Sequence, residues 1–165
     1  MPALSTETIA PDFSLPLLEG GNFSLQQALK QGPVLLTFFK SSCPVCQFAL
    51  PYVERLFQAY GKQNAGVIGI SQDDAGATKS FCKEYGLTLP IALDDTKRYL
   101  VSNAYGLTNV PTLFLIAPSG EIQVSSVGWS RPDIEQISRA LAEAGQTKLI
   151  PAIHKGENVP DFKAG

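Results

Sequence analysis

The sequence predicts an α/β fold, a sandwich in which helices flank a mixed central β-sheet. Three continuous apolar runs have the length and the content of β-branched and aromatic residues that are typical of buried strands: 34–39, 65–71 and 112–117. Segments with helical periodicity separate these runs, and a hairpin and a last helix complete the pattern. A chain of 165 residues fits one domain with a sizeable core.

The chain before the first buried strand predicts an N-terminal β-hairpin extension. Residues 9–18 alternate weakly between apolar and polar side chains and contain prolines, which suits an edge strand. A turn signal, Glu19-Gly20-Gly21-Asn22, separates them from a second short strand at 23–25. Ser24 is a candidate N-cap for a helix that continues through Lys30.

The first buried strand leads into a helix that carries two cysteines at its start. Apolar residues recur every three or four positions from Cys46 to Tyr60, which indicates an amphipathic helix. Pro51 lacks the N–H that would bond to the preceding turn, so we expect a kink there. Gly61 is the expected end of the helix.

Two helices and a hairpin are expected in the second half of the chain. The helices cover 75–85 and 96–105, each followed by a glycine, and residues 90–93 form a short extended piece between them. A tight turn at 118–121 connects the third buried strand to an antiparallel partner at 122–127.

The last helix is followed by a segment with little periodicity. Ser130 and Asp133 give a capping signal, and an apolar stripe follows them. Residues 145–165 are expected to form an extended tail on the surface or on a partner subunit. The predicted domain therefore covers residues 1–144.

Composition argues against two classes of partner. Lys and Arg number 13 and Asp and Glu number 15, without a basic cluster, so we expect neither nucleic acid nor a membrane surface as a partner. Residues 1–8 lack the features of a signal peptide, and no stretch approaches the ~20 apolar residues that span a bilayer. We expect a cytoplasmic protein, or a periplasmic one if a signal peptide has been removed, and a monomer or weak homodimer.

The motif Cys43-Pro44-Val45-Cys46 lies where the first buried strand gives way to its helix. Unpaired N–H groups and the positive end of the helix dipole lie at such a junction, so they favour a thiolate on Cys43. Cys46, one helical turn further on, is placed to attack a mixed disulfide formed on Cys43. Lys40 can add positive charge nearby. The pair predicts a redox-active Cys43–Cys46 disulfide without a further cofactor.

A Cys-X-X-Cys pair can also be half of a zinc site or two inert core cysteines. Zinc usually takes four ligands, and the other candidate ligands of this type are Cys82 and His154. A proline between two cysteines at a helix start argues against an inert pair. The redox interpretation is therefore favoured, with no metal.

A second motif, Asn109-Val110-Pro111-Thr112, enters the third buried strand. Pro111 cannot pair like an interior strand residue, so it is either a turn proline with a cis bond to Val110 or an ordinary trans proline that begins a strand. Together with the cysteine motif, the 117–121 hairpin and the opening residues 10–15, this motif resembles the thioredoxin superfamily. The similarity is to its redoxin branch of TlpA-like and AhpC/TSA-like proteins, over roughly residues 9–144.

The resemblance implies a thioredoxin-like three-layer sandwich and a thiol-disulfide oxidoreductase. Cys43 would be the attacking thiolate, Cys46 the resolving thiol, and Pro111 the cis-proline that faces them. The backbone of Val110 would hydrogen-bond an extended substrate segment. Asp73 matches an acidic residue that some TlpA-like proteins keep near the cysteines to manage protons, or it is a loop aspartate or helix cap.

The resemblance also implies two partners, a protein disulfide as substrate and an electron-donor reductase. In a reducing cytoplasm the expected direction is reduction of the substrate. Thioredoxins proper carry a buried aspartate and a tryptophan where this chain has Thr37 and Ser42, which argues against a housekeeping thioredoxin. Val45, Gln47 and Phe48 are expected to border the exposed sulfur, or to be ordinary helix packing.

A thiol peroxidase is the first alternative function. Peroxiredoxins place threonine or serine three residues before the peroxidatic cysteine and proline four residues before that. Aligned on Cys46, those places hold Cys43 and Phe39. Cys82 would then be the resolving cysteine, although a buried small side chain is the favoured reading of it.

A non-catalytic copper-binding redoxin is the second alternative. The two thiols of the motif would bind copper(I). Such proteins often add a histidine or methionine near the pair. Met1 and His154 give this alternative little support.

Overall fold

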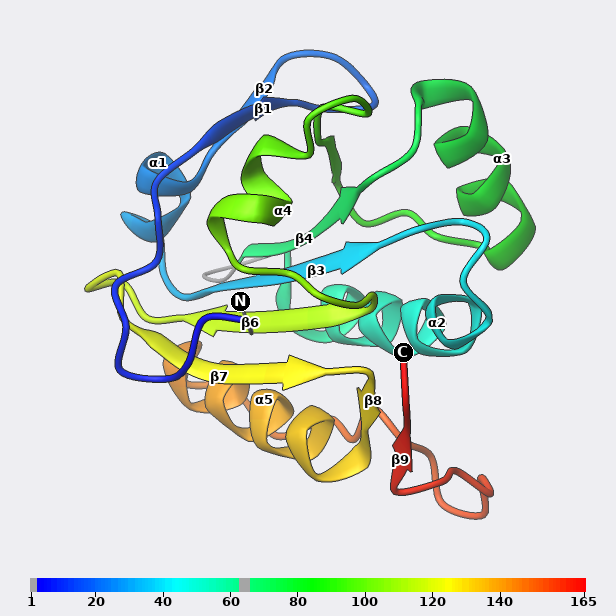
Figure 1. Ribbon diagram of the computed structural model, residues 1–165. Coiled ribbons are helices and arrows are strands. Elements are labelled where there is room, and N and C mark those ends of the chain that lie inside the picture. The colour runs from blue at the N-terminus through cyan, green and yellow to red at the C-terminus, as the bar shows by residue number, and fades with distance from the viewer. Residues whose placement is uncertain (1–2, 63–65) are drawn as a thin grey trace.

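The computed structural model describes residues 3–62 and 66–165; Met1, Pro2 and Ala65, to which some of the expectations above refer, lie outside the described residues. A five-stranded mixed sheet forms the centre, in the order β5-β4-β3-β6-β7, and helices cover both of its faces (Figure 1). The strands are β1 (Ser14–Pro16), β2 (Asn22–Ser24), β3 (Val34–Phe39), β4 (Gly66–Ser71), β5 (Ile91–Leu93), β6 (Thr112–Ile116), β7 (Ile122–Val127), β8 (Trp129–Ser130) and β9 (Phe162–Lys163). The helices are α1 (Leu25–Leu29), α2 (Pro44–Tyr60), α3 (Ala75–Tyr85), α4 (Leu100–Ala104) and α5 (Arg131–Ala144).

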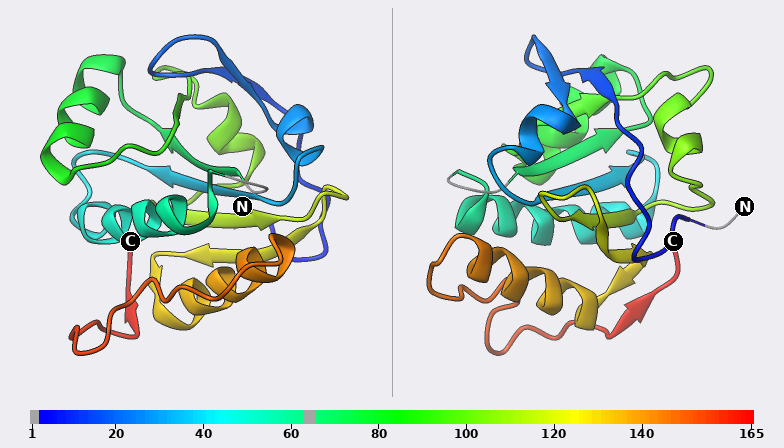
Figure 2. Two further views of the ribbon diagram at one scale, coloured as in Figure 1. Left: turned by 180° about the vertical axis from the view of Figure 1, so that it is seen from behind. Right: turned by 90° about the vertical axis from the view of Figure 1, so that its left-hand side faces the viewer.

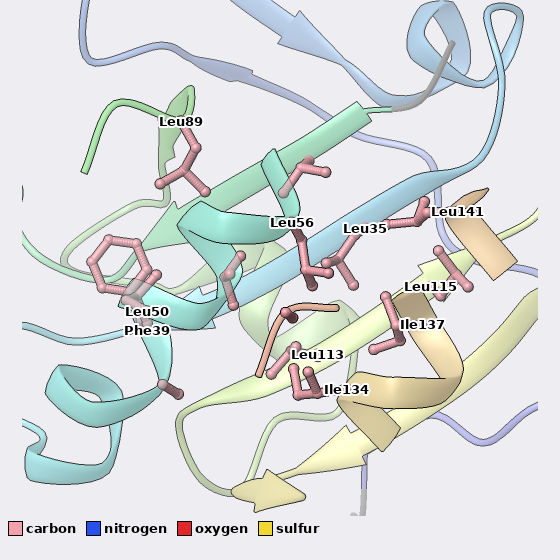
Figure 3. Packing of buried hydrophobic residues seen from close by; sticks show 14 of the residues in the cluster. Leu35, Phe39, Leu50, Leu56, Leu89, Leu113, Leu115, Ile134, Ile137 and Leu141 are labelled. Carbon is pink, nitrogen blue, oxygen red and sulfur yellow. The ribbon is translucent and has the colours of Figure 1, made fainter. Parts of the chain in front are cut away.

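The sheet separates two hydrophobic clusters, because alternate residues of a strand point to opposite faces. Leu35 and Phe39 of β3 pack with the apolar stripes of α2 and α5 on one face (Figure 3). Leu36 and Phe38 pack on the other face with residues of α1, α4 and the N-terminal hairpin. All six residues of β3 are buried, as its continuous apolar run predicts. The three-layer sandwich is confirmed.

The direction of the strands brings the two sequence motifs to the same edge of the sheet. Strand β3 is parallel to β4 and antiparallel to β6, with Phe38 paired to Thr112. The end of β3 therefore lies beside the start of β6. The turn that leads to Cys43 follows the end of β3, and Val110 and Pro111 come directly before the start of β6.

The helix expected over 96–105 is shorter than predicted. It begins at Leu100, because the side chain of Asp95 accepts hydrogen bonds from the backbone N–H groups of Lys97 and Arg98 and holds them in a turn. Tyr99 then adopts a left-handed backbone conformation, with φ of 49°, which prevents the helix from extending back through it.

The helix of the cysteine motif, α2, does run to Tyr60, and it includes Pro51.

Residues 145–165 lie along the chain's own helices α2 and α5 (Figure 2). Arg55 of α2 donates hydrogen bonds to the carbonyl oxygen of Ala152 and to both carboxylate oxygens of Glu157. Ala152 and Val159 are buried in the same cluster as α2 and α5. The segment ends in strand β9, which pairs with β8, and the expectation of an extended tail stays a prediction. The domain boundary expected after residue 144 stays a prediction.

We expect Glu157→Gln to destabilise the protein at neutral pH and to have less effect in acid. Hydrogen bonds from Arg55 and from the backbone of His154 lower the pKa of Glu157 to about 2. A carboxylate whose pKa is lowered on folding stabilises the folded state above its ordinary pKa, and this contribution is lost as the pH falls through the folded value. Thermal unfolding of both proteins between neutral pH and about pH 2 measures the difference. Glu121→Gln, at an exposed position directly after the turn between β6 and β7, is the control; a pH-independent difference would contradict the expectation.

Candidate active site

Cys43 is the N-cap of α2 and is held there by its own backbone and side chain. Its φ and ψ of −87° and 116° are extended, and its sulfur accepts a hydrogen bond of 3.2 Å from the backbone N–H of Cys46. Pro44 takes the first helical position, where its missing N–H costs no hydrogen bond. The N–H of Cys43 donates to the carbonyl oxygen of Lys40 at 3.2 Å and closes the turn between strand and helix. The sulfur of Cys43 therefore lies at the N-terminus of a 17-residue helix.

The two cysteines differ sharply in their environments. Both are free thiols, but the side chain of Cys43 is partly exposed, whereas Cys46 is completely buried. Burial, the hydrogen bond with Cys43 and the negative charge of Asp73 raise the pKa of the Cys46 thiol far above its ordinary value. Of the two residues, Cys43 is therefore the one open to solvent.

Val110 contacts the cysteine motif, and Pro111 follows it in the chain. The peptide bond between them is cis, as one of the two sequence-based readings expects. The thiol of Cys43 donates a hydrogen bond of 3.4 Å to the carbonyl oxygen of Val110. Two segments that are 67 residues apart in the sequence thus meet at one sulfur atom.

Asp73 lies beside the cysteine loop. Its carboxylate accepts a hydrogen bond of 2.7 Å from the backbone N–H of Ser41, and the carbonyl oxygen of Ser41 accepts one from the side chain of Gln47. The cap of α3 is the neighbouring Asp74, so the reading of Asp73 as a helix cap is wrong. The carboxylate is near enough to raise the pKa of Cys46.

The side chain of Lys40 lies against Tyr99. Its ammonium group lies 5.7 Å from the centroid of the Tyr99 ring, a distance typical of a cation–π contact. Its carbonyl oxygen accepts the hydrogen bond from the N–H of Cys43, and the expectation that its charge acts on the cysteines stays a prediction.

The corner at residues 128–130 belongs to the site and was not predicted. The N–H of Gly128 donates a hydrogen bond of 2.8 Å to the carbonyl oxygen of Pro111. The ring of Trp129 packs edge-on against that of Phe48 at 5.0 Å, which places this corner against the cysteine helix. The signal that could have indicated the corner is the one tryptophan of the chain, which directly follows a glycine at the end of an alternating strand.

Within the described residues, Thr37 and Cys82 make none of the site contacts given above. Thr37 is buried, and its hydroxyl oxygen has no hydrogen-bond partner among residues 3–62 and 66–165. Cys82 is partly buried on α3 and packs against the cluster that contains α2. Burial, with smaller effects of Glu19 and Glu54, raises the pKa of its thiol. These surroundings are typical of a small core side chain.

Side chains that commonly bind metals do not gather in larger groups in the described part of the structure. There, no group of three or more His, Cys, Asp or Glu side chains is placed to hold an ion. His154 lies in the segment 145–165, and its Nδ1 is 3.9 Å from Oε1 of Glu157. Within the same described ranges, none of the helices has the length and apolarity to cross a membrane.

Comparisons with known proteins indicate a family for this chain. The model of the AhpC/TSA family matches residues 6–125. The thiol-disulfide oxidoreductase ResA of Geobacillus thermodenitrificans is 32% identical over 136 residues, which cover 81% of this chain and 76% of that protein. ResA of Halalkalibacterium halodurans is 33% identical over 134 residues, or 80% of this chain and 74% of that protein.

Solved structures show the same fold. A putative thiol:disulfide interchange protein DsbE from Chlorobium tepidum superimposes with a TM-score of 0.74 at 25% identity, and covers 86% of this chain and 98% of that one. The thioredoxin domain of a thiol-disulfide oxidoreductase from Bacteroides vulgatus gives a TM-score of 0.73 at 22% identity, over 83% of this chain and 97% of that domain. The central sheet and its flanking helices are therefore thioredoxin-like.

Proposed function

This chain belongs to the AhpC/TSA family, in the redoxin branch of the thioredoxin superfamily, and on that premise we propose that it reduces disulfides through Cys43 and Cys46. The observation that carries the proposal is the difference between the two thiols. Cys43 is accessible and lies at a helix N-terminus, whereas Cys46 is completely buried and has a raised pKa. Their roles follow from this difference, because a thiolate that substrate can reach is the nucleophile.

The reaction consists of two exchanges. The thiolate of Cys43 attacks one sulfur of the substrate disulfide, a mixed disulfide forms, and the other substrate sulfur leaves as a thiolate. The thiol of Cys46 then loses its proton and attacks the sulfur of Cys43, which releases the second substrate thiol. The substrate gains two electrons and two protons, and the enzyme is left with a Cys43–Cys46 disulfide. A dithiol reductase must return the enzyme to its reduced form.

The backbone of Val110 is the proposed contact for a protein substrate. Its carbonyl oxygen already accepts a hydrogen bond from the thiol of Cys43, so a chain paired with Val110 would lie beside the reactive sulfur. An extended segment that adds to such an edge is bound by its main chain and selected by its side chains. This mode suits protein disulfides of varied sequence.

The peroxidase alternative has less support. It requires Cys46 to attack the peroxide as a thiolate. Burial and the raised pKa of Cys46 oppose both its ionisation and the approach of a peroxide.

A single-turnover reaction tests the proposed function. The reduced protein, freed of excess reductant, is mixed with glutathione disulfide or with insulin, and the products are mapped after alkylation. We expect two thiols to be lost per chain, with a disulfide between Cys43 and Cys46 and a free thiol at Cys82. A disulfide that includes Cys82, or oxidation by hydrogen peroxide that is faster than oxidation by either disulfide, would contradict the proposal.

We expect Asp73→Asn to slow the second exchange and leave the first almost unchanged. The buried Cys46 needs a proton acceptor, and the nearby carboxylate can serve as one, directly or through water. Asparagine keeps an oxygen that can accept the hydrogen bond from Ser41. The resolving rate should fall by about 10²-fold, the lower end of a general-base contribution. Quenched-flow measurement of mixed-disulfide decay, with Asp74→Asn as control, checks this; equal decay rates would show that Asp73 does not act as the base.

A further inference from the structure

Residues 161–165, here called the strap, lie across the end of the sheet that carries the active site. Strand β9 of the strap pairs antiparallel with β8, with Trp129 opposite Lys163. The N–H of Arg131 donates a hydrogen bond of 2.8 Å to the carbonyl oxygen of Asp161. The indole N–H of Trp129 donates one of 2.7 Å to the carbonyl oxygen of Pro160, directly before the strap. Figure 1 shows this last segment, in red, reaching the end of the sheet where β6 begins.

The far end of the strap contacts the backbone of Val110. The side-chain amide of Asn109 donates a hydrogen bond of 3.1 Å to the carbonyl oxygen of Gly165. A Cβ atom built on Gly165 would clash with the carbonyl oxygen of Val110 and would lie 3.0 Å from its carbonyl carbon. The same atom would lie 3.4 Å from Cδ of Pro111. Gly165 therefore lies directly on the backbone beside the cis-proline.

Gly128 shows the same close approach along the middle of the strap. A Cβ atom built on Gly128 would clash with the carbonyl oxygen of Lys163 and would lie 3.1 Å from the backbone nitrogen of Gly165. Gly128 also has a φ of 78°, which glycine adopts at little cost. Two glycines thus let the strap backbone lie against the corner of residues 128–130 and against Val110.

We propose that the strap occupies, within the same chain, the position where an extended protein substrate would pair with Val110. The inference rests on the function proposed above, because it concerns the same carbonyl oxygen that accepts the hydrogen bond from the thiol of Cys43. A small disulfide needs only the sulfur of Cys43 and reacts with the strap in place. A protein disulfide reacts after the strap has been displaced, so the strap biases the enzyme toward low-molecular-weight disulfides.

The strap is held by contacts that can be released. All five of its residues are exposed, and the side chain of Phe162 is 60% exposed. Besides the strand pairing and the backbone hydrogen bond from Arg131 to Asp161, it makes the hydrogen bond from Asn109 and a contact of the Lys163 ammonium group, 5.3 Å from the ring centroid of Phe48. A segment with exposed backbone hydrogen bonds and few buried side chains opens at a low free-energy cost.

Gly165→Ala in the full chain tests the proposal, because the added methyl group would clash with Val110 and move the strap away. We expect the single-turnover rate with insulin to rise about tenfold, since apparent affinity scales with the open fraction, while the rate with glutathione disulfide stays the same. Ala164→Ser, at an exposed position of the same segment, is the matched control and should change neither rate. An unchanged ratio of the two rates in Gly165→Ala would overturn the proposal.

Amide hydrogen exchange gives a readout that does not depend on turnover. In a Cys46→Ser, Cys82→Ala background, which cannot resolve a mixed disulfide, Cys43 is joined through a disulfide either to an extended cysteine-containing peptide or to a methylthio group. We expect the amides of Phe162 and Lys163 to exchange about tenfold faster with the peptide than with the methylthio group, since the peptide populates the open state. Equal exchange overturns the strap proposal. If the unsubstituted protein reduced neither insulin nor glutathione disulfide while the peptide adduct still exchanged faster, the proposed function would be rejected and the strap kept.

Discussion

Cys43→Ser is expected to abolish disulfide reduction, whereas Cys46→Ser should stop the reaction at a mixed disulfide. The first variant lacks the accessible nucleophile, and the buried thiol of Cys46, with its raised pKa, cannot replace it. We expect the rate to fall by ~10³-fold or more, as is found when an essential nucleophile is removed. The second variant keeps the attacking sulfur and its hydrogen bond to Val110 but has no thiol to release the product.

Mass spectrometry of the intact protein after reaction with glutathione disulfide measures both results. Cys46→Ser should carry one glutathione on Cys43, and Cys43→Ser should carry none at Cys46. Cys82→Ser is the matched control and should behave like the unsubstituted protein. Residual turnover in Cys43→Ser that depends on Cys46 would reverse the roles assigned here and favour the peroxidase-like arrangement.

Glu54→Ala is expected to cause the largest loss of stability, about 3 kcal/mol, since each buried donor that loses its partner costs ~1–3 kcal/mol. Glu54 is almost completely buried on α2. One of its carboxylate oxygens accepts hydrogen bonds from the backbone N–H groups of Thr88 and Leu89, at 2.8 and 2.9 Å. The other accepts from the hydroxyl of Thr88 at 2.6 Å and from the side chain of Gln58 at 2.7 Å. The carboxylate thus ties the cysteine helix to the chain that enters β5.

Urea denaturation gives the free energy of unfolding of each variant. Glu54→Gln keeps the shape and one acceptor oxygen, so its loss should be smaller than that of Glu54→Ala. Glu84→Ala, at an exposed position on α3, is the control and should stay within ~0.5 kcal/mol of the unsubstituted protein. A loss below ~1 kcal/mol in Glu54→Ala would mean that water replaces the carboxylate as the acceptor.

The parts of the fold that were predicted correctly depend on residues close together in the sequence. The buried runs at 34–39 and 112–117 became β3 and β6, and the apolar stripe after Cys46 became α2. The capping signal at Ser130 is confirmed by the hydrogen bond from the N–H of Asp133. In each case the periodicity of one segment decides which of its faces is buried.

Two expectations were corrected because side-chain hydrogen bonds, one set local and one between distant segments, decided the structure where the sequence pattern did not. The helix expected from Thr96 lost its first turn to the side chain of Asp95. The cap of α3 proved to be Asp74, which left Asp73 free to bond the loop of the cysteines. Nothing in the neighbourhood of Asp73 in the sequence indicates that Ser41 will be its partner.

The sequence by itself determined the α/β class, the order of the main elements and the pair of cysteines on which the chemistry is proposed to depend. These properties are set by side chains within a few residues of one another, through strand alternation, helical periodicity and capping. Only the tertiary structure decided that the sulfur of Cys43 meets Val110, that Asp73 lies beside the cysteine loop and that residues 161–165 cover the same edge. Such contacts join segments far apart in the chain. They depend on strand direction, register and packing, which the pattern of residues within one segment does not predict.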